Sequence, residues 1–498
     1  MTRRLAILST IILLLFAVIA AQAANVQFVR APALDASPLN PRVSEASTLY
    51  PRGEIVAADG TILAQSVATT GLYPYKRIYP LGSLTSGVVG FSSPSYGLWG
   101  LESEYNNYLS AHAQPPQSLA QLLAPTAAAD TVTLTLQPAL QKIAQNALNG
   151  QDGAAVVLNP TTGGVLAMYS NPNYDPTPLT SSDFTVASAA WKIDTTNDAH
   201  GFPPLGLVAT QQTFPPGSTF KVITTAAAVV GRPDLLIKSY PSIHVTKLPN
   251  TNLTLQNFGF EKCGGIVSVM LPVSCDTGYA LLGLDLGGNL MSATADSFGY
   301  NQVPPLDLPG VQPSYFPPAS AFQYDLPGLA YSSIGQKNVR ASALMNALVA
   351  AAIANGGQMM TPHLLDYVSS PDGSIVKKYK PSVWQTPLTS LQASQIVPLM
   401  QNVVRYGTAA GIFPAADDVA AKTGTAQTGN SAKNTDDWMI AFAPASHPTI
   451  AVAVVVPYQV ISGTGAQVAG PVVKCLVEGA LALQSGLPAT GTASTCPR

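Results

Sequence analysis

Charged side chains are scarce in this sequence. Lysine and arginine number 24 and aspartate and glutamate 26 among 498 residues, so 10% of the chain is charged and the net charge is −2. Disordered chains and coiled coils need charge in quantity, and this composition excludes both classes. No basic cluster exceeds Lys377-Lys378, so nothing could follow a phosphate backbone and no nucleic-acid partner is predicted. The length predicts two or three domains.

Histidine and cysteine are also rare, with five and four residues. The histidines are scattered and the cysteines lack a CxxC spacing, so we expect neither a metal nor a cofactor. Proximity in the sequence favours pairing Cys263 with Cys275 and Cys475 with Cys496. The first bridge would close a short loop and contribute about 3 kcal/mol. Buried free thiols are the alternative, because cysteine is often a core residue.

One long apolar run stands near the N-terminus. Leu5 to Ala24 is a stretch of 20 residues without a charge, enough for a helix to cross a hydrocarbon core of about 30 Å. Arg3 and Arg4 precede it, which predicts a single-pass topology with everything after the span on the extracytoplasmic side. Ala21-Gln22-Ala23 also fits a cleavage site, so residues 1–24 are either a transmembrane anchor or a signal segment.

Two further parts are predicted after residue 24. In residues 25–130, Glu54 to Gln65 reads as a hairpin that turns at Asp59-Gly60, and residues 112–130 read as a linker of alanine, proline and glutamine. Residues 131–498 begin and end with strands and contain helices between them, most clearly 222–230, 341–354 and 391–404. Strands at both termini of this part predict an α+β domain, with one sheet covered by helices.

The first chemical motif is a serine followed three residues later by a lysine. Ser218 follows Pro215-Pro216-Gly217 near the start of a predicted helix. Residues three apart share a helix face, which places the Lys221 amine beside the Ser218 hydroxyl. A lysine can activate a serine only when burial or a neighbouring cation lowers its pKa. Alone, this motif is weak because it occurs by chance in most large proteins.

Two later motifs make the pattern specific. Ser274-Cys275-Asp276 follows the first motif, and Lys422-Thr423-Gly424 lies on a predicted strand edge and is followed by Thr425. Glycine at that edge lets a ligand approach the backbone. The order Ser-x-x-Lys, Ser-x-Asn or similar, Lys-Thr-Gly is typical of penicillin-recognising serine enzymes.

The sequence resembles a class B penicillin-binding protein, a peptidoglycan D,D-transpeptidase, over nearly the whole chain. The resemblance implies a membrane-anchored, β-rich N-terminal pedestal in residues 25–130. It implies a transpeptidase domain in residues 131–498, with an antiparallel sheet covered by helices and an all-helical subdomain. The segments that carry it outside the three motifs are 52–55, 59–60 and 63–64; Arg77, 79–80, Gly82 and 100–102; 133–138; and 333–336, 353–357 and 406–409.

The resemblance also implies roles for individual residues. Ser218 would attack the bond between two terminal D-alanines of a stem peptide, with Lys221 as base and Ser274 passing the proton to the leaving group. Lys422, Thr423, Gly424 and Thr425 would hold the substrate carboxylate, and the Lys422 charge would help keep Lys221 neutral. A β-lactam would acylate Ser218. Elongation or division proteins are the protein partners that such an enzyme would have.

Position 276 departs from the family pattern. The family usually has asparagine there, which can donate and accept hydrogen bonds, whereas ionised Asp276 can only accept. A carboxylate near Lys221 would also favour its ammonium form. Three interpretations stay open: a tolerated variant paired to a lysine, a tuned pKa, or a weakened enzyme.

Three rival functions share these motifs. A class A β-lactamase would use a glutamate for deacylation, and the chain has none between Glu261 and Glu478. A D,D-carboxypeptidase would differ only in using water as acceptor. A scaffold of the wall-synthesis machinery with a residual pocket is the non-enzyme alternative. Near the third motif, we expect Asp436 and Asp437 in a solvated turn and Trp438 in the core or the cleft wall.

Overall fold

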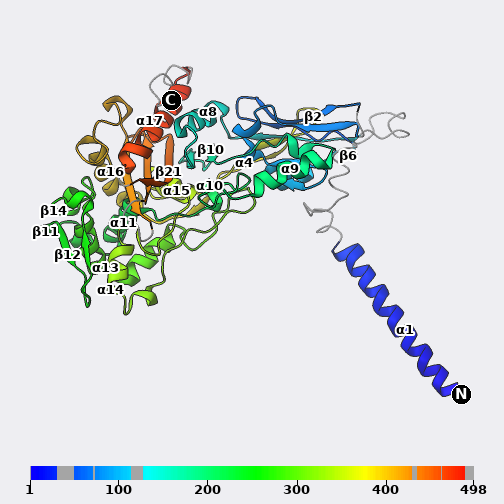
Figure 1. The fold of residues 1–498 in the computed structure, drawn as a ribbon, viewed down its shortest axis with the longest axis horizontal. Coiled ribbons are helices and arrows are strands. Elements are labelled where there is room, and N and C mark those ends of the chain that lie inside the picture. Colours follow the sequence, from blue (N-terminus) through cyan, green and yellow to red (C-terminus); the bar gives the residue numbers. More distant parts are fainter. Residues whose placement is uncertain are drawn as a thin grey trace.

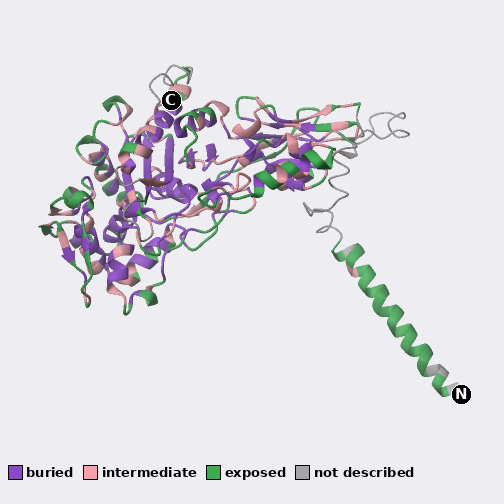
Figure 2. Cartoon of the chain, viewed as in Figure 1, coloured by how far each residue is buried: buried purple, intermediate pink, exposed green. Residues whose placement is uncertain are grey.

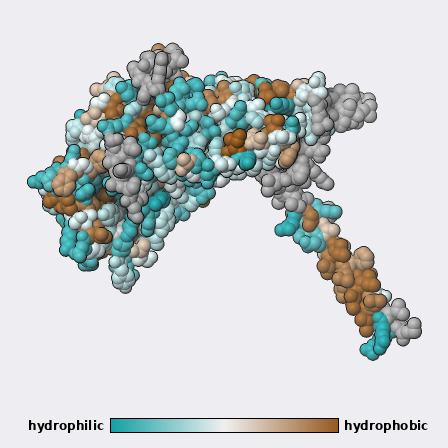
Figure 3. All heavy atoms as spheres, in the orientation of Figure 1, coloured by the Kyte–Doolittle hydropathy of each residue, from teal (hydrophilic) through white to brown (hydrophobic). Residues whose placement is uncertain are grey.

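The N-terminal apolar run is a helix that stands apart from the rest of the protein (Figure 1). The structure is a computed structural model that describes residues 2–30, 50–70, 73–113, 127–428, 434–460 and 463–487. Helix α1 (Thr2–Ala24) continues as a π-helical turn to Val29, and residues 7–27 are long and apolar enough to span a membrane, with none of that window buried. Figure 3 shows apolar atoms along this helix. Helix α17 (Gly465–Gln484) passes the same test, but it is half buried against the protein.

A six-stranded sheet forms the β-rich part of the molecule. Its strands are β1 (Ile55–Val56), β2 (Ile62–Ala68), β3 (Tyr75–Ile78), β8 (Thr131–Leu134), β16 (Leu365–Ser369) and β17 (Ile375–Lys378). The order is β17-β16-β8-β1-β2-β3, with β1 and β8 parallel and the other pairs antiparallel. The hairpin predicted at Asp59-Gly60 is confirmed as β1 and β2. Because β8, β16 and β17 come from beyond residue 130, this sheet connects the two predicted parts of the chain.

A buried ion cluster holds the N-terminal part together. Glu102 is fully buried between Arg52 and Arg77, at 2.9 and 2.6 Å, and Tyr79 donates a hydrogen bond to it. Arg77 also donates to the carbonyl of Gly53. A buried carboxylate needs such partners, so these residues fix the fold of this part. The short elements around them are α4 (Ser86–Val89), β4 (Phe91–Ser93), β5 (Gly97–Trp99), α5 (Leu101–Glu104), α6 (Asn106–Leu109), β6 (His112–Ala113) and β7 (Ala127–Ala128).

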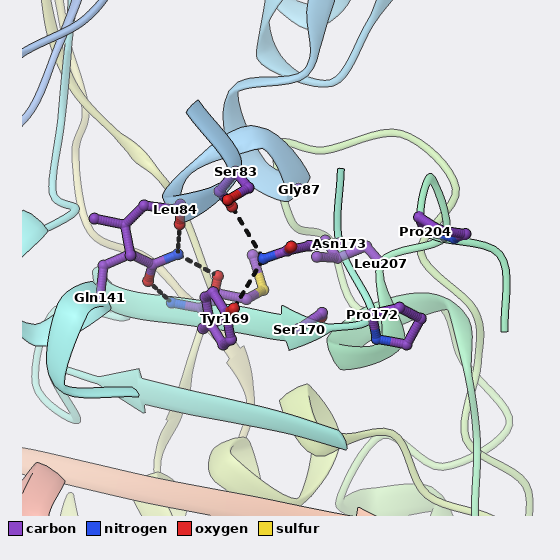
Figure 4. Close-up of a pocket in the computed structure, with 12 residues that line it drawn as sticks. Ser83, Leu84, Gly87, Gln141, Tyr169, Ser170, Pro172, Asn173, Pro204 and Leu207 are labelled. Atoms are coloured by element: carbon purple, nitrogen blue, oxygen red, sulfur yellow. Dashed lines mark hydrogen bonds between the residues drawn. The ribbon is translucent and has the colours of Figure 1, made fainter. Parts of the chain in front are cut away.

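The N-terminal part is hydrogen-bonded to the remainder through Gln141 of helix α8 (Pro138–Leu148). Its amide donates to the carbonyls of Leu84 and Met168 and accepts from the Met168 amide, and Asn173 donates to Ser83 (Figure 4). These bonds join strand β10 and helix α8 to the segment that precedes α4. These hydrogen bonds therefore attach the remainder of the chain to its β-rich neighbour.

A five-stranded antiparallel sheet carries the third motif. Its strands are β9 (Gly153–Leu158), β10 (Val165–Asn171), β19 (Ala420–Gln427), β20 (Asn434–Ala443) and β21 (Ile450–Val460). The order is β10-β9-β21-β20-β19, so β19 lies at an edge. The apolar run of β20 is buried on both faces. Met439 lies beside α17 on one face, and Trp438 donates a hydrogen bond to the Pro215 carbonyl on the other. Two-sided burial explains why this strand lacks polar alternation.

Helices cover this sheet and build a second subdomain beside it. Helices α8 and α17 pack on one face and α15 on the other, and Figure 2 shows that the buried residues concentrate there. The three helices predicted most clearly are confirmed as α11, α15 and α16, and the α+β fold class is confirmed. The helices are α9 (Phe184–Thr195), α10 (Val208–Gln211), α11 (Lys221–Gly231), α12 (Val267–Met270), α13 (Asp276–Ser297), α14 (Leu326–Ser332), α15 (Ala343–Ala354) and α16 (Ser390–Arg405).

Short strand pairs decorate the helical subdomain and its surroundings. Two of these pairs, β11 with β14 and β12 with β13, lie between α11 and α12 in the chain and were not predicted. The short strands are β11 (Tyr240–Ile243), β12 (Val245–Lys247), β13 (Thr254–Gln256), β14 (Cys263–Gly265), β15 (Met359–Met360) and β18 (Val383–Gln385). The β11 to β14 region forms one wall of the pocket described next.

Candidate active site

The serine of the first motif lies in a 3-10 turn that leads directly into α11. Gly217 donates its backbone N–H to the carbonyl of Gly335 at 2.9 Å, and Ser218 follows within the turn Gly217–Phe220. Gly335 has φ +73°, and a Cβ there would lie 2.1 Å from the Gly217 oxygen. Only glycine fits this close approach. The loop of the first motif is therefore held in place by a segment more than a hundred residues further along the chain.

The second motif is held by a strained backbone and a disulfide. Ser274 has φ +58°, a conformation that residues other than glycine rarely adopt. Cys275 is bonded to Cys263 of β14, and the structure thus confirms the first predicted pairing and excludes free thiols for these two cysteines. Cys475 is buried in α17, whereas its expected partner Cys496 lies outside the described residues, so that pairing stays a prediction. The bridge fixes the residue between Ser274 and Asp276.

Lys221 is completely buried and reaches from the first motif to the second. Its Nζ donates to the Ser274 carbonyl at 2.6 Å, to Ser274 Oγ at 3.3 Å and to Asp276 Oδ1 at 2.7 Å. The other Asp276 oxygen accepts the Phe258 backbone N–H at 3.3 Å. Asp276 is also the first residue of α13, where the helix dipole favours a negative charge. The carboxylate therefore has three stabilising interactions, one of which is the lysine pairing considered above.

Lys422 approaches the same serine from the opposite side. It is fully buried, and its Nζ donates to Ser274 Oγ at 2.9 Å and to the Thr423 carbonyl at 2.9 Å. Thr423 shares a hydrogen bond of 2.6 Å with Thr408. The Ser274 hydroxyl thus lies between two lysines that come from distant segments of the chain.

Burial controls the protonation of both lysines. It lowers the pKa of Lys221, and the charge and hydrogen bond of Asp276 oppose this shift. It lowers the pKa of Lys422 well below the usual value, and the nearby Lys221 charge lowers it further. The main cause of the Lys221 shift is therefore burial, and the Lys422 charge that we expected to help keep this lysine neutral is not among the causes.

One pocket contains five of the eight predicted site residues: Ser218, Ser274, Asp276, Thr423 and Thr425. Lys221 and Lys422 do not line it but donate hydrogen bonds to its lining residues Ser274, Asp276 and Thr423. Gly424 does not line the pocket. A Cβ there would lie 2.8 Å from the Pro216 oxygen, so this glycine makes room for the first-motif loop, whereas we had expected it to make room for a ligand. The lining residues that sequence analysis missed are Asn257, Phe258, Glu261, Cys263, Val273, Thr408, Thr464 and Ala466. Two of them had a signal: Thr408 within the family-like segment 406–409, and Cys263 in its predicted pairing with Cys275.

The expectation for Asp436 and Asp437 is wrong. Both are buried in β20, 1% and 0% exposed, because the strand begins at Asn434, four residues before Trp438, and pairs with β19 and β21. Burial raises the pKa of each to about 7. Trp438 is fully buried and donates its indole N–H to the Pro215 carbonyl at 2.9 Å, so it supports the first-motif loop from the side of the sheet.

A half-buried serine followed three residues later by a buried lysine, beside the edge strand of an antiparallel sheet, is typical of a penicillin-recognising serine enzyme, and comparison with known proteins gives the family. The model of the penicillin binding protein transpeptidase domain matches residues 153–478, and that of the penicillin binding protein A dimerisation domain matches residues 52–129. The peptidoglycan D,D-transpeptidase PbpA of Mycolicibacterium smegmatis is 36% identical over 94% of this chain and 97% of its own length. The PbpA of Mycobacterium tuberculosis is 33% identical over 95% and 98%.

Solved structures agree with the sequence relatives. The ceftriaxone acyl-enzyme complex of penicillin-binding protein A from M. tuberculosis superposes with a TM-score of 0.78 at 31% identity, covering 87% of this chain and 99% of the other. Its penicillin G acyl-enzyme has the same TM-score at 32% identity, covering 86% and 99%. The chain belongs to the class B penicillin-binding proteins.

Proposed function

We propose that Ser218 is the nucleophile with which this enzyme cross-links peptidoglycan as a D,D-transpeptidase. Its hydroxyl oxygen attacks the carbonyl between the two terminal D-alanines of a stem peptide. The peptide bond breaks, the terminal D-alanine leaves with a proton, and an ester forms on Ser218. An amine of a second stem peptide then attacks the ester, forms the new amide and returns a proton to Ser218. A β-lactam enters the first step and leaves a stable ester.

One observation carries the assignment of the proton path: the Ser274 hydroxyl lies between Lys221 and Lys422. A neutral lysine has two N–H donors and one lone pair. If Asp276 and the Ser274 carbonyl accept the two donors of Lys221, its lone pair is left for a hydroxyl hydrogen. Lys221 then takes the proton of Ser218, and Ser274, which accepts from Lys422, passes a proton to the leaving amine.

The third motif supplies the groups that hold the substrate. Thr423 and Thr425 line the pocket, and Lys422 lies behind them, with its Nζ on the Thr423 carbonyl. We assign these groups to the terminal carboxylate of the stem peptide or to the carboxylate of a β-lactam. The backbone N–H groups of Ser218 and Thr425 are assigned to the oxyanion, where one such donor is worth about 3 kcal/mol.

The contacts of Asp276 favour the first of its three interpretations, a tolerated variant. It accepts from Lys221 and from Phe258, and it stands at the N-terminus of α13, which is helical up to the break at Gly287. All three interactions suit a carboxylate. The cost is a stronger hold of Lys221 on its proton.

The finer organisation of the chain is part of the same proposal. Residues 1–24 are a single-pass anchor, residues 25–130 a pedestal, and residues 131–498 the transpeptidase domain on the extracytoplasmic side. Stem peptides are the donor and acceptor substrates, and elongation or division proteins bind the enzyme.

The test is covalent labelling of the full chain in detergent with a fluorescent penicillin. We expect an adduct that persists for hours, that is lost in Ser218→Ala and that is retained in the control Ser394→Ala, which alters an exposed serine of α16. An adduct that decays within minutes would indicate a β-lactamase. Absence of any adduct would indicate a scaffold with a residual pocket.

A second assay separates the transpeptidase from a carboxypeptidase. The enzyme is given a D-Ala-D-Ala peptide with and without an amine acceptor, and the products are separated by mass. A cross-linked product that grows with acceptor concentration supports the proposal, and hydrolysis alone at every concentration contradicts it.

A further inference from the structure

A buried carboxyl group without a partner lies directly behind the substrate-binding edge of the sheet. Asp437 of β20 is opposite Thr425 of β19 in the strand register, and its side chain is completely buried. Neither of its oxygens has a partner at hydrogen-bond geometry in the described part of the chain, although the Thr425 and Thr435 hydroxyls lie close enough to lower its pKa. The Thr435 hydroxyl, two residues earlier on the same face, also lacks such a partner. Thr425 itself lines the pocket, so Asp437 is one side chain away from it.

The surroundings of Asp437 among the described residues hold no counter-charge. Its neighbour on β21 is Val456, and the first turn of α17 lies beside it, where Gly465 N–H donates to Thr425 Oγ1 at 2.9 Å. The titratable residues of the elements packed around it are directed elsewhere: Lys422 to Ser274, Asp436 to the opposite face of β20, Tyr458 next to Asp436, and Lys474 to Glu478.

The Thr425 hydroxyl can serve the substrate in only one of two orientations. A hydroxyl has one hydrogen and two lone pairs, and one lone pair already accepts from Gly465. An ionised Asp437 can only accept, so it would turn the hydroxyl hydrogen inward, away from the pocket. A protonated Asp437 can donate to the second lone pair and leave that hydrogen for the pocket.

We infer that Asp437 is a positioning residue, which in its protonated form directs the Thr425 hydroxyl toward the substrate carboxylate and in its ionised form withdraws it. This inference rests on the proposed role of Thr425. Burial supports it, since it raises the pKa of Asp437 to about 7, against the opposing influence of the Thr435 and Thr425 hydroxyls. The switch between the two forms therefore falls within the pH range in which the enzyme can be assayed.

The test compares acylation of the wild type and of Asp437→Asn by a carboxylate-bearing penicillin across the pH range. Asparagine has the same shape and can donate to Thr425 but has no charge. The two proteins should react equally at about pH 6. The ratio of the variant's acylation rate constant to that of the wild type should then rise by up to about tenfold by about pH 8, as Asp437 ionises.

Asp436→Asn is the matched control, because Asp436 is the preceding residue, is equally buried and faces the other side of β20. Its pH profile should follow that of the wild type. Parallel profiles for the wild type and Asp437→Asn, or an equal change in Asp436→Asn, would overturn the inference. Should Asp437→Asn fold poorly, Asp437→Ser is the second variant, because serine also supplies a donor. Its acylation rate must likewise show no decline at high pH.

A penicillin methyl ester separates positioning from a general effect on the fold. The ester has no carboxylate for Thr425, so its acylation profile should be the same with and without Asp437. An equal effect on acid and ester would overturn the inference. If the proposed function itself fails, no protein is acylated at any pH, which is a different outcome from parallel profiles.

Discussion

Replacing Asp276 with asparagine should move the pH dependence of acylation without removing activity. Burial lowers the pKa of Lys221 and the Asp276 charge opposes that shift. Removing the charge leaves burial unopposed, so the pKa of Lys221 falls further and more of the amine is neutral at a given pH. The rising limb of the acylation profile should therefore move to lower pH.

The size of the shift follows from the contact. Unit charges at the 2.7 Å between Lys221 Nζ and Asp276 Oδ1 interact by about 6 kcal/mol at an effective dielectric constant of about 20. That figure is a ceiling of about four pKa units, and carboxylates that neighbour cations typically shift a pKa by about 1–3 units. We expect a displacement of about two units. At pH values below this rising limb, the variant should be acylated about a hundredfold faster than the wild type. At pH values above it, the two rate constants should agree within about tenfold.

The assay is the second-order rate constant for acylation by a fluorescent penicillin, measured at closely spaced pH values. Asp285→Asn is the control: this residue is on the same helix and also pairs with a lysine, at 2.6 Å, but at an exposed position. If the rising limb of Asp276→Asn lies within about 0.3 pH units of the wild-type limb, the reasoning is refuted. A fall in rate at every pH would show that Asp276 orients Lys221 in a way that asparagine cannot.

Four further substitutions test the supports of the site. Cys263→Ser should lower the unfolding free energy by about 3 kcal/mol and slow acylation; unchanged values of both would exclude a structural role of the bridge. Gly335→Ala should slow acylation at least tenfold, whereas Gly411→Ala, with φ +78° but open space, should not. Glu102→Gln should lower the free energy of unfolding, measured by denaturant titration, by about 3–5 kcal/mol, because two buried guanidinium groups lose their counter-charge. Asp436→Asn should stabilise the protein by up to about 4 kcal/mol at about pH 8 and by nothing at about pH 4, since a raised carboxyl pKa makes the wild type lose stability as pH rises between these values.

The motif residues were predictable because their chemistry is local in the sequence. A serine and a lysine three residues apart, a Ser-x-Asp step and a Lys-Thr-Gly edge each specify a side chain and its immediate backbone. The structure adds the contacts between motifs, above all Ser274 between Lys221 and Lys422. No spacing in the sequence encodes these distances, because they depend on how the helical subdomain packs against β19.

Residues that the sequence misassigned are polar groups inside strands or loops. Two consecutive aspartates predict a position exposed to solvent, because charged side chains are almost never buried. The strand register overrides this rule at Asp436 and Asp437, which lie inside a sheet sealed by α17 and the first-motif loop. Thr408 was missed for a related reason: it meets Thr423 only through tertiary packing. Such positions can be located only when the register of β19 and β20 is known.

The charges at the site lead us to expect that an aspartate at position 276 alters the working pH and not the reaction. With one of the two lysines neutral and the other protonated, Asp276 brings the local charge to zero, whereas the asparagine usual in the family would leave one positive charge. A substrate carboxylate then makes the complex negative here and neutral in the usual arrangement. Substrate binding in this chain therefore favours protonation of Lys221, which makes it a stronger proton acceptor but a rarer free amine at low pH. The two effects oppose each other, so we expect a site with all its contacts intact to react by the same steps at a higher pH.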